Sequence, residues 1–144
     1  MYKVIHEKKP KRKTLHVVPK IYDFIETKWD GNYLVMESLG PNLEELFVWC
    51  GKKFSLKTTI WIADRVLEIL DVFHSNKLVC VDMKPANFLL GKGKDSNKLY
   101  IIDLGFVEKF TDSEGQQFTF SEGHGLRGPS LFASVWNHYG SNEV

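Results

Sequence analysis

Little cysteine, little net charge and no long hydrophobic run characterise this sequence of 144 residues. The two cysteines, Cys50 and Cys80, lie in apolar stretches, so we expect reduced core residues and no disulfide. Lys and Arg total 19 against 18 Asp and Glu, which favours neither nucleic acid nor a membrane as a partner. No apolar run approaches the roughly 18 residues that a membrane span needs. We therefore expect a soluble chain.

The apolar residues that are present suffice for one domain with a core. Hydrophobic residues make up 43% of the sequence and aromatic residues 13%, which is a globular composition. The first residues lack the apolar stretch of a signal peptide, so we expect an intracellular protein, cytoplasmic or nuclear. Residues 8–13, KKPKRK, would form a solvated basic loop or, less simply, a nuclear localisation signal.

Turn residues predict a β-hairpin in the first third of the chain. Residues 21–25 alternate apolar and polar side chains, and residues 33–36 are a second apolar run. Asp30-Gly31 lies between them, and this dipeptide favours a hairpin turn because glycine adopts a positive φ easily. Gly40-Pro41 then interrupts the chain before the next element.

Cap residues predict two helices after this break. Asn42 and Glu45 match a capping box at the start of a short helix that Gly51 ends. Ser55 caps a second helix of about 20 residues that runs to residues 75–76. The apolar positions are Leu43, Leu46, Phe47 and Cys50 in the first helix, and Ile60, Ala63, Val66, Leu67, Leu70 and Phe73 in the second.

The rest of the chain is organised around three short apolar runs between residues 78 and 105. Residues 78–81, 88–90 and 99–102 predict buried strands, the last two joined as a hairpin. Polar side chains stand at the ends of these strands, and we expect them to meet. They are Asp82, Lys84, Asn87 and Asp103.

This set of side chains is the one that phosphoryl transfer requires. One Asp can accept the proton of an attacking hydroxyl, and the Lys can neutralise the γ-phosphate. Asn87 and Asp103 offer hard oxygen ligands for Mg²⁺. Asn87 follows Asp82 by five residues and Asp103 begins a D-x-G triplet, both as in protein kinases. A chance cluster of loop residues would not keep this order and spacing.

Four segments of the chain resemble the casein kinase I branch of the eukaryotic protein kinases. They are YLVMESLGPNLEELF at 33–47, FSLKTTIWIADRVLEILDVFHS at 54–75, DMKPANFLLGKGK at 82–94 and YIIDLG at 100–105. The L-G-P before the first helix and the K-P-x-N-F-L loop are more typical of this branch than of kinases in general. Weaker likeness extends the resemblance over about residues 17–140.

The resemblance implies a role for each site residue. Asp82 would be the catalytic base and Lys84 the partner of the γ-phosphate, while Asn87 and Asp103 would bind Mg²⁺. ATP would lie against five further residues: Met36 as gatekeeper, Glu37 and Leu39 through their backbone, Leu89 as the floor and Ile102 as the back wall. The substrates would be proteins that carry Ser or Thr.

Some positions depart from the family pattern. The His and Arg that usually precede the catalytic Asp are Cys80 and Val81, so switching by an activation-loop phosphate is not expected. Leu104 replaces the Phe of D-F-G. Within the implied activation segment, residues 103–134, Pro129 replaces a hydroxyl residue and Leu131 replaces an arginine that favours phosphorylated substrates.

The implied fold class is α+β, protein-kinase-like and incomplete. Residues 1–39 would be the last part of the N-lobe sheet and the hinge, and residues 40–144 the first half of the helical C-lobe. The glycine-rich loop and the strand lysine of a kinase are not found. We therefore expect apolar faces of the helix at 55–76 to be exposed and the chain to associate with itself or a partner.

Two functions remain open at this point. The chain would be a serine/threonine protein kinase of casein kinase I type, or a non-catalytic, pseudokinase-like fragment that acts as a protein-interaction module. Retention of the four charged and amide side chains, Asp82, Lys84, Asn87 and Asp103, favours the kinase. Pro129 and Val81 favour the interaction module.

Overall fold

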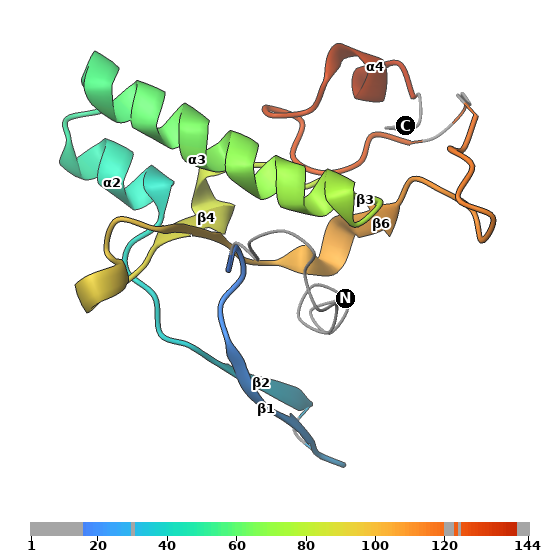
Figure 1. Ribbon diagram of the computed structural model, residues 1–144, viewed down its shortest axis with the longest axis horizontal. Coiled ribbons are helices and arrows are strands. Elements are labelled where there is room, and N and C mark those ends of the chain that lie inside the picture. Colours follow the sequence, from blue (N-terminus) through green and yellow to red (C-terminus); the bar gives the residue numbers. More distant parts are fainter. Residues whose placement is uncertain (1–15, 30, 120–122, 124, 141–144) are drawn as a thin grey trace.

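The computed structural model describes residues 16–29, 31–119, 123 and 125–140, and its fold is mixed α+β, as predicted (Figure 1). In chain order the elements are β1 Ile21–Glu26, β2 Asn32–Met36, α2 Leu43–Trp49, α3 Leu56–Ser75, β3 Leu78–Cys80, η1 Pro85–Asn87, β4 Phe88–Leu90, η2 Gly93–Asp95, β5 Leu99–Ile101, η3 Leu104–Phe106, β6 Val107–Lys109 and α4 Val135–His138. The basic cluster at residues 8–13 lies outside the described residues.

The strands form three antiparallel pairs in the described part of the chain. β1 pairs with β2 and β4 with β5, as predicted, whereas β3 pairs with β6. The sequence did not predict β6, because Val107-Glu-Lys109 is too short and too polar to show an alternating pattern. The three predicted strands therefore belong to two separate sheets.

The β1–β2 hairpin projects away from the helices (Figure 1). Glu26 faces Asn32 in its register, so the connection spans residues 27–31. Gly31 has a φ of +79°, a conformation that glycine adopts at low cost, while Asp30 lies outside the described residues. The apolar side chains of both strands are largely exposed, among them Phe24 at 54% and Tyr33 at 45%.

The predicted caps begin both helices. The Asn42 side chain accepts a hydrogen bond from the Glu45 N–H (2.8 Å), and the Glu45 carboxylate accepts one from the Asn42 N–H (3.0 Å). Ser55 Oγ accepts a hydrogen bond from the Thr58 N–H (3.1 Å) at the start of α3. These bonds satisfy N–H groups that have no partner within the helix, which is why the helices begin there.

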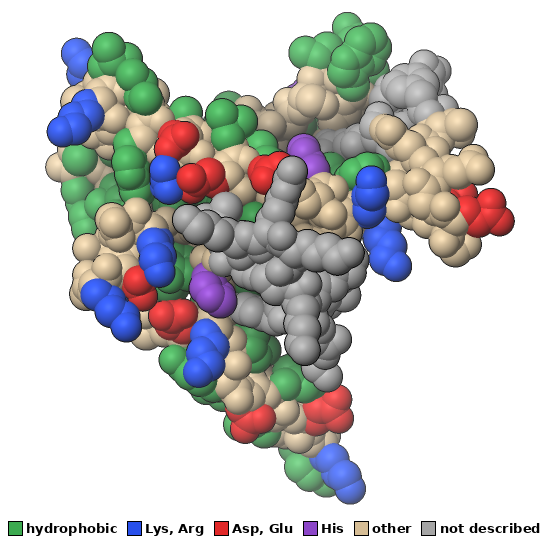
Figure 2. Space-filling model, in the orientation of Figure 1, with side chains coloured by type: hydrophobic (Ala, Val, Ile, Leu, Met, Phe, Trp, Pro, Cys, Tyr) green, Lys and Arg blue, Asp and Glu red, His purple; other side chains and the backbone are tan. Residues whose placement is uncertain are grey.

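Helix α3 has two apolar faces, and only one of them packs into the core. Ile69 and Phe73 are buried there, with Val66 beside them. The predicted stripe was wrong in part, because Ile60 is 60% exposed and Leu67 is 65% exposed. Periodicity shows that a face is apolar and does not show which face the tertiary structure covers. Figure 2 shows hydrophobic side chains along the outer side of this helix.

The core joins α3 to the short strands. The Ile101 N–H donates to the Val17 carbonyl (2.8 Å), which fixes the segment before β1 against β5. Cys80 is buried as predicted, but Cys50 is exposed at the end of α2, so its assignment to the core was wrong. Neither Cys50 nor Cys80 is part of a disulfide. None of the helices in the described ranges has the length and apolarity that a bilayer crossing requires. The core side chains are Val17, Val18, Leu43, Ile69, Phe73, Leu78, Cys80, Phe88, Leu99, Ile101, Leu104 and Val107.

Two isoleucines of α3 provide a matched test of this core. Ile69 is 2% exposed, so Ile69→Ala should lower the free energy of unfolding by about 2–5 kcal/mol, because it leaves a cavity. Ile60→Ala, the same change on the outer face, should cost less than about 1 kcal/mol. Urea unfolding followed by far-ultraviolet circular dichroism measures both. Equal losses would mean that the outer face is covered in solution.

Candidate active site

Asp82 lies directly after β3, where the backbone is fixed from two sides. β3 pairs with β6, and the Val81 N–H donates to the Phe106 carbonyl (3.2 Å). On the other side, a Cβ on Gly128 would lie 3.0 Å from the Val81 carbonyl oxygen, and Gly128 has a φ of +74°. Only glycine fits this close approach without strain. The Asp82 side chain is consequently buried, with the residue 2% exposed.

The buried carboxylate of Asp82 is hydrogen-bonded on one oxygen. Its Oδ2 accepts from Lys84 Nζ (2.7 Å) and from Asn87 Nδ2 (2.9 Å). Asn87 Nδ2 also donates to the Asp82 backbone carbonyl (2.9 Å). The other oxygen, Oδ1, is buried and has no hydrogen-bond partner among the described residues. This oxygen can accept a proton from a hydroxyl group that enters the site.

Lys84 and Asn87 both reach Asp82, and they lie at the two ends of a single 3₁₀ turn. Pro85 begins η1, and the Asn87 N–H donates to the Lys84 carbonyl (3.0 Å) across it. Lys84 lies just before the turn, which then folds the chain back so that Asn87, five positions after Asp82, reaches the same carboxylate oxygen. The predicted association of Asp82, Lys84 and Asn87 is present in the structure.

Lys84 is held in its charged form by neighbouring carboxylates. The hydrogen bond to Asp82 raises the pKa of Lys84, the charges of Asp82, Asp103 and Glu44 add to it, and partial burial opposes it. The effect of Asp103 shows that this carboxylate, 19 positions further along the chain than Lys84, lies within electrostatic reach of the ammonium group.

Asp103 is placed by the β4–β5 hairpin. Phe88 faces Ile101 in this pair, and the Ile102 N–H donates to the Asn87 carbonyl (2.9 Å). Asn87 and Asp103 therefore lie at the same end of the hairpin. Asp103 has a φ of +56°, an uncommon conformation for a residue with a side chain, and it precedes η3, whose Leu104 is buried. Such local strain is often found at functional sites.

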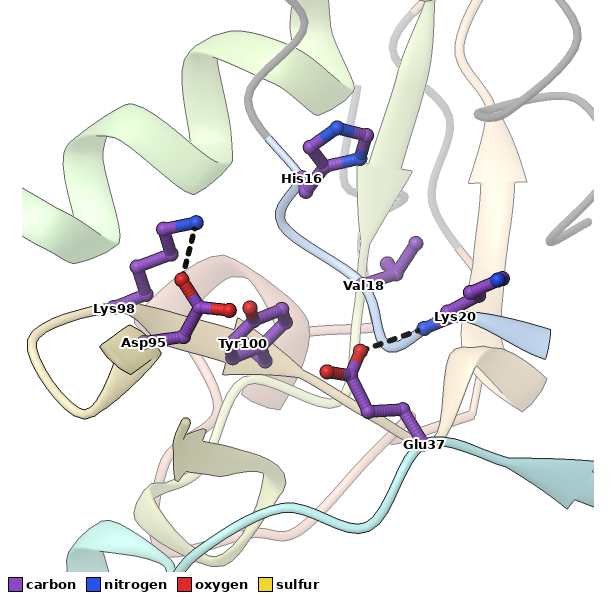
Figure 3. Close-up of a pocket in the computed structure, with 7 residues that line it drawn as sticks. All are labelled: His16, Val18, Lys20, Glu37, Asp95, Lys98 and Tyr100. Carbon is purple, nitrogen blue, oxygen red and sulfur yellow. Dashed lines mark hydrogen bonds and ion pairs between the residues drawn. The ribbon is translucent and has the colours of Figure 1, made fainter. Parts of the chain in front are cut away.

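The five residues expected around the nucleotide are all half-buried. Gly40 and Leu90 hydrogen-bond through their backbones (2.7 Å), and a Cβ on Gly40 would lie 3.0 Å from the Leu90 carbonyl oxygen. This close approach places the segment after Leu39 along β4, which carries Leu89. The Glu37 carboxylate accepts a hydrogen bond from the Lys20 N–H (3.2 Å), as Figure 3 shows. The five residues are Met36, Glu37, Leu39, Leu89 and Ile102.

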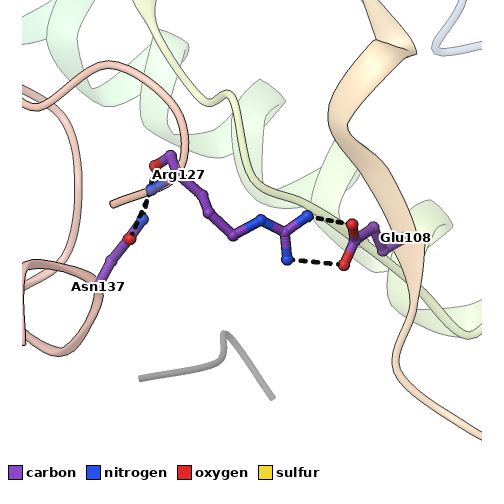
Figure 4. A network of polar contacts seen from close by, with 3 residues as sticks. All are labelled: Glu108, Arg127 and Asn137. Carbon is purple, nitrogen blue, oxygen red and sulfur yellow. Dashed lines mark hydrogen bonds and ion pairs between the residues drawn. The ribbon is translucent and has the colours of Figure 1, made fainter. Parts of the chain in front are cut away.

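A polar network that the sequence did not predict holds the segment around Gly128. The Arg127 guanidinium forms a two-pronged ion pair with Glu108 of β6, which lowers the pKa of Glu108 (Figure 4). Asn137 brackets the Arg127 backbone: its Oδ1 accepts from the N–H (3.0 Å), and its Nδ2 donates to the carbonyl (2.7 Å). In the sequence, Ser134 is a residue type that favours helix N-caps, and this signal could have indicated the short helix α4 that carries Asn137.

The Lys84–Asp82 ion pair predicts a pH dependence in the alkaline range. A raised lysine pKa stabilises the fold below the unfolded pKa, and this contribution is lost as the pH rises through the folded pKa. The difference in free energy of unfolding between wild type and Lys84→Met should therefore be constant between about pH 7 and pH 9.5 and shrink above about pH 10.5. Urea titrations across this range measure it. Lys53→Met, an exposed lysine, should show no such change, and a constant difference for Lys84→Met would argue against the ion pair.

The family of the chain follows from a match to a known domain. A family model described as a protein kinase domain matches residues 4–130, which is most of the sequence. The mixed α+β fold, with small sheets and helices, agrees with part of a protein-kinase-like fold. Members of this family are phosphate-transferring enzymes that generally use ATP and Mg²⁺. The chain belongs to the protein kinase family.

Proposed function

We propose that the chain is a serine/threonine protein kinase of casein kinase I type, which transfers the γ-phosphate of ATP to Ser or Thr hydroxyls of proteins. The observation that carries this proposal is the carboxylate of Asp82. One of its oxygens is fixed by Lys84 and Asn87, and the other is buried and unpartnered in the described part of the chain. That arrangement supports a proton acceptor at Oδ1.

Asp82 would act on the attacking hydroxyl, and Lys84 would act on the transferred phosphate. Asp82 Oδ1 would orient the substrate hydroxyl and accept its proton as the oxygen attacks. The ammonium group of Lys84, which is half-exposed, would turn from Asp82 toward the transferred phosphate and offset its charge. The hydrogen bonds from Asn87 would keep the Asp82 carboxylate in place during this change.

Asn87 and Asp103 fit the ligand set of Mg²⁺. Both hydrogen bonds of the Asn87 side chain come from Nδ2, which leaves Oδ1 as a ligand, and Asp103 is exposed at the same end of the hairpin. In the described ranges no group of three or more His, Cys, Asp or Glu side chains could enclose a metal. Mg²⁺ is commonly held by one or two protein oxygens plus phosphates, so two ligands are adequate. The ion would neutralise phosphate charge.

The five half-buried residues near the hinge would hold the nucleotide. Leu39, Leu89 and Ile102 offer apolar side chains for the adenine ring, and the backbone at Glu37 and Leu39 offers hydrogen-bonding groups. Met36 would limit the depth of this site. In this proposal, residues 1–39 supply the N-lobe remnant and hinge, and residues 40–144 supply the first half of the C-lobe.

The casein kinase I assignment rests on sequence motifs that the fold uses. The close approach of Gly40 to Leu90 gives a physical reason for the glycine in the L-G-P motif. Pro85, which begins η1, gives one for the proline of the catalytic loop. One position departs from the family pattern. Leu131, which is 84% exposed, stands where the casein kinase I branch has an arginine that favours phosphorylated substrates.

The exposed outer face of α3 favours a second candidate function, that of a non-catalytic protein-interaction module. Leu56 is 77% exposed, and Ile60 and Leu67 lie on the same face. A partner or a second copy could cover these side chains. Binding of Mg²⁺ and ATP separates the two candidates, because only the kinase requires it.

Asp103→Asn tests the kinase proposal. The change keeps the shape of the side chain and removes the charge of a proposed metal ligand. We expect Mg²⁺-dependent ATP affinity to fall about 10–100-fold, the range for losing a hydrogen bond or ligand that carries charge. Isothermal titration calorimetry with ATP, with and without Mg²⁺, measures it.

The matched control is Asp71→Asn, which removes an exposed carboxylate from α3. It should leave the affinity for ATP and Mg²⁺ unchanged. If neither the wild type nor the control binds ATP, the kinase proposal fails and the interaction module remains. If Asp103→Asn binds as tightly as the wild type, Asp103 is not a metal ligand.

A further inference from the structure

A pocket lies beside the hinge, away from Asp82, Lys84, Asn87 and Asp103. It has a volume of about 350 Å³ and lies between the segment before β1, Glu37, and the β4–β5 hairpin (Figure 3). Seven residues line it: His16, Val18, Lys20, Glu37, Asp95, Lys98 and Tyr100. Its size suits a small organic molecule.

The wall of this pocket combines apolar surface with one hydroxyl group. Val18 is 1% exposed and Tyr100 is 3% exposed, so both are firmly packed. Among the described residues, the Tyr100 hydroxyl forms no hydrogen bond. The hydroxyl belongs to a residue that lines the pocket, so it can donate to or accept from a ligand there.

Two carboxylates in the pocket each retain one oxygen for a ligand. Asp95 uses Oδ1 to bind Lys98 Nζ (2.7 Å), and Glu37 uses Oε2 to accept the Lys20 N–H (3.2 Å). Their second oxygens, Asp95 Oδ2 and Glu37 Oε1, have no hydrogen-bond partner among the described residues. Burial, together with the charges of Glu37 and Asp95, raises the pKa of Tyr100, and Lys98 only partly opposes this. Two carboxylates therefore lie within electrostatic reach of the hydroxyl.

The two lysines that line the pocket already interact with other side chains of the protein. Lys98 is paired with Asp95, and the ammonium group of Lys20 lies 5.1 Å from the ring centre of Tyr22, a cation–π contact. Among the described residues, His16 is the one basic residue of the lining with no hydrogen bond, ion pair or ring contact, and its effect on the pKa of Asp95 is smaller than those of Lys98 and Lys94. An anionic ligand would have to break the Lys98–Asp95 ion pair or lie beside both carboxylates.

We propose that this pocket binds a small organic cation, with an ammonium or guanidinium group between Glu37, Asp95 and the Tyr100 hydroxyl and a short apolar chain against Val18. The free carboxylate oxygens would accept its N–H groups, and the tyrosine oxygen would accept a further one. Guanidinium is favoured because its planar, forked donors can reach two acceptors at once.

The pocket adjoins the proposed nucleotide site without being part of it. Tyr100 faces Leu89 across the β4–β5 pair, and side chains of facing residues lie on the same side of a sheet. An occupant would contact the side chain of Glu37, whose backbone is expected to meet adenine. The inference concerns binding alone, so it does not depend on kinase activity.

Saturation-transfer NMR on the whole chain with butylguanidinium as probe tests the proposal. The expected Kd is on the order of 1 mM, given the few atoms of the probe. Asp95→Asn should weaken binding about tenfold or more, and Tyr100→Phe, which removes only the hydroxyl, about three- to tenfold. Glu114→Gln, in the loop after β6, is the control and should leave the Kd unchanged.

Two further probes of similar length test whether the pocket prefers a positively charged ligand. Neutral pentanamide and anionic butyrate should both bind at least about tenfold more weakly than butylguanidinium. The proposal is overturned if either binds as tightly, or if Asp95→Asn and Tyr100→Phe keep the wild-type Kd. Circular dichroism melts of each variant, compared with that of the control, show whether a loss of binding comes from unfolding.

Discussion

The buried carboxylate of Asp82 is the constraint on which the rest of the site depends. A charge with 2% exposure is costly unless hydrogen bonds and a counter-charge offset the loss of water. Lys84 and Asn87 supply both, and Asn87 reaches Asp82 because η1 turns the chain within three residues. The same bonds leave one oxygen without a partner. Stability and the capacity to accept a proton therefore arise from one arrangement.

The backbone around this carboxylate is fixed from parts of the chain that are distant in sequence. β6 pairs with β3, and Gly128 approaches the Val81 carbonyl at a distance that only glycine allows. Arg127, next to Gly128, is tied to β6 through Glu108, and Asn137 holds its backbone. The segment after β6 thus supports the position of Asp82, although it supplies no residue to the proposed chemistry.

Burial is distributed unevenly over the molecule. The core joins the inner face of α3 to β3, β4 and β5, whereas the β1–β2 hairpin and the outer face of α3 expose apolar side chains. Two-stranded hairpins are marginal by themselves, so the hairpin depends on its link to the body through the segment at Glu37. That segment adjoins both the proposed nucleotide residues and the pocket at Tyr100, which places both proposed binding sites beside the least supported part of the fold.

The sequence by itself determined the elements whose signals are local. Caps at Asn42 and Ser55 and apolar runs at the strands act over a few residues, and the five-residue spacing from Asp82 to Asn87 spans one turn. Tertiary structure alone decided which face of α3 is buried, that Cys50 is exposed, and that β3 pairs with β6. It also formed the pocket at Tyr100. These features depend on contacts between distant segments, and a one-dimensional pattern of polarity contains no information about which segments meet.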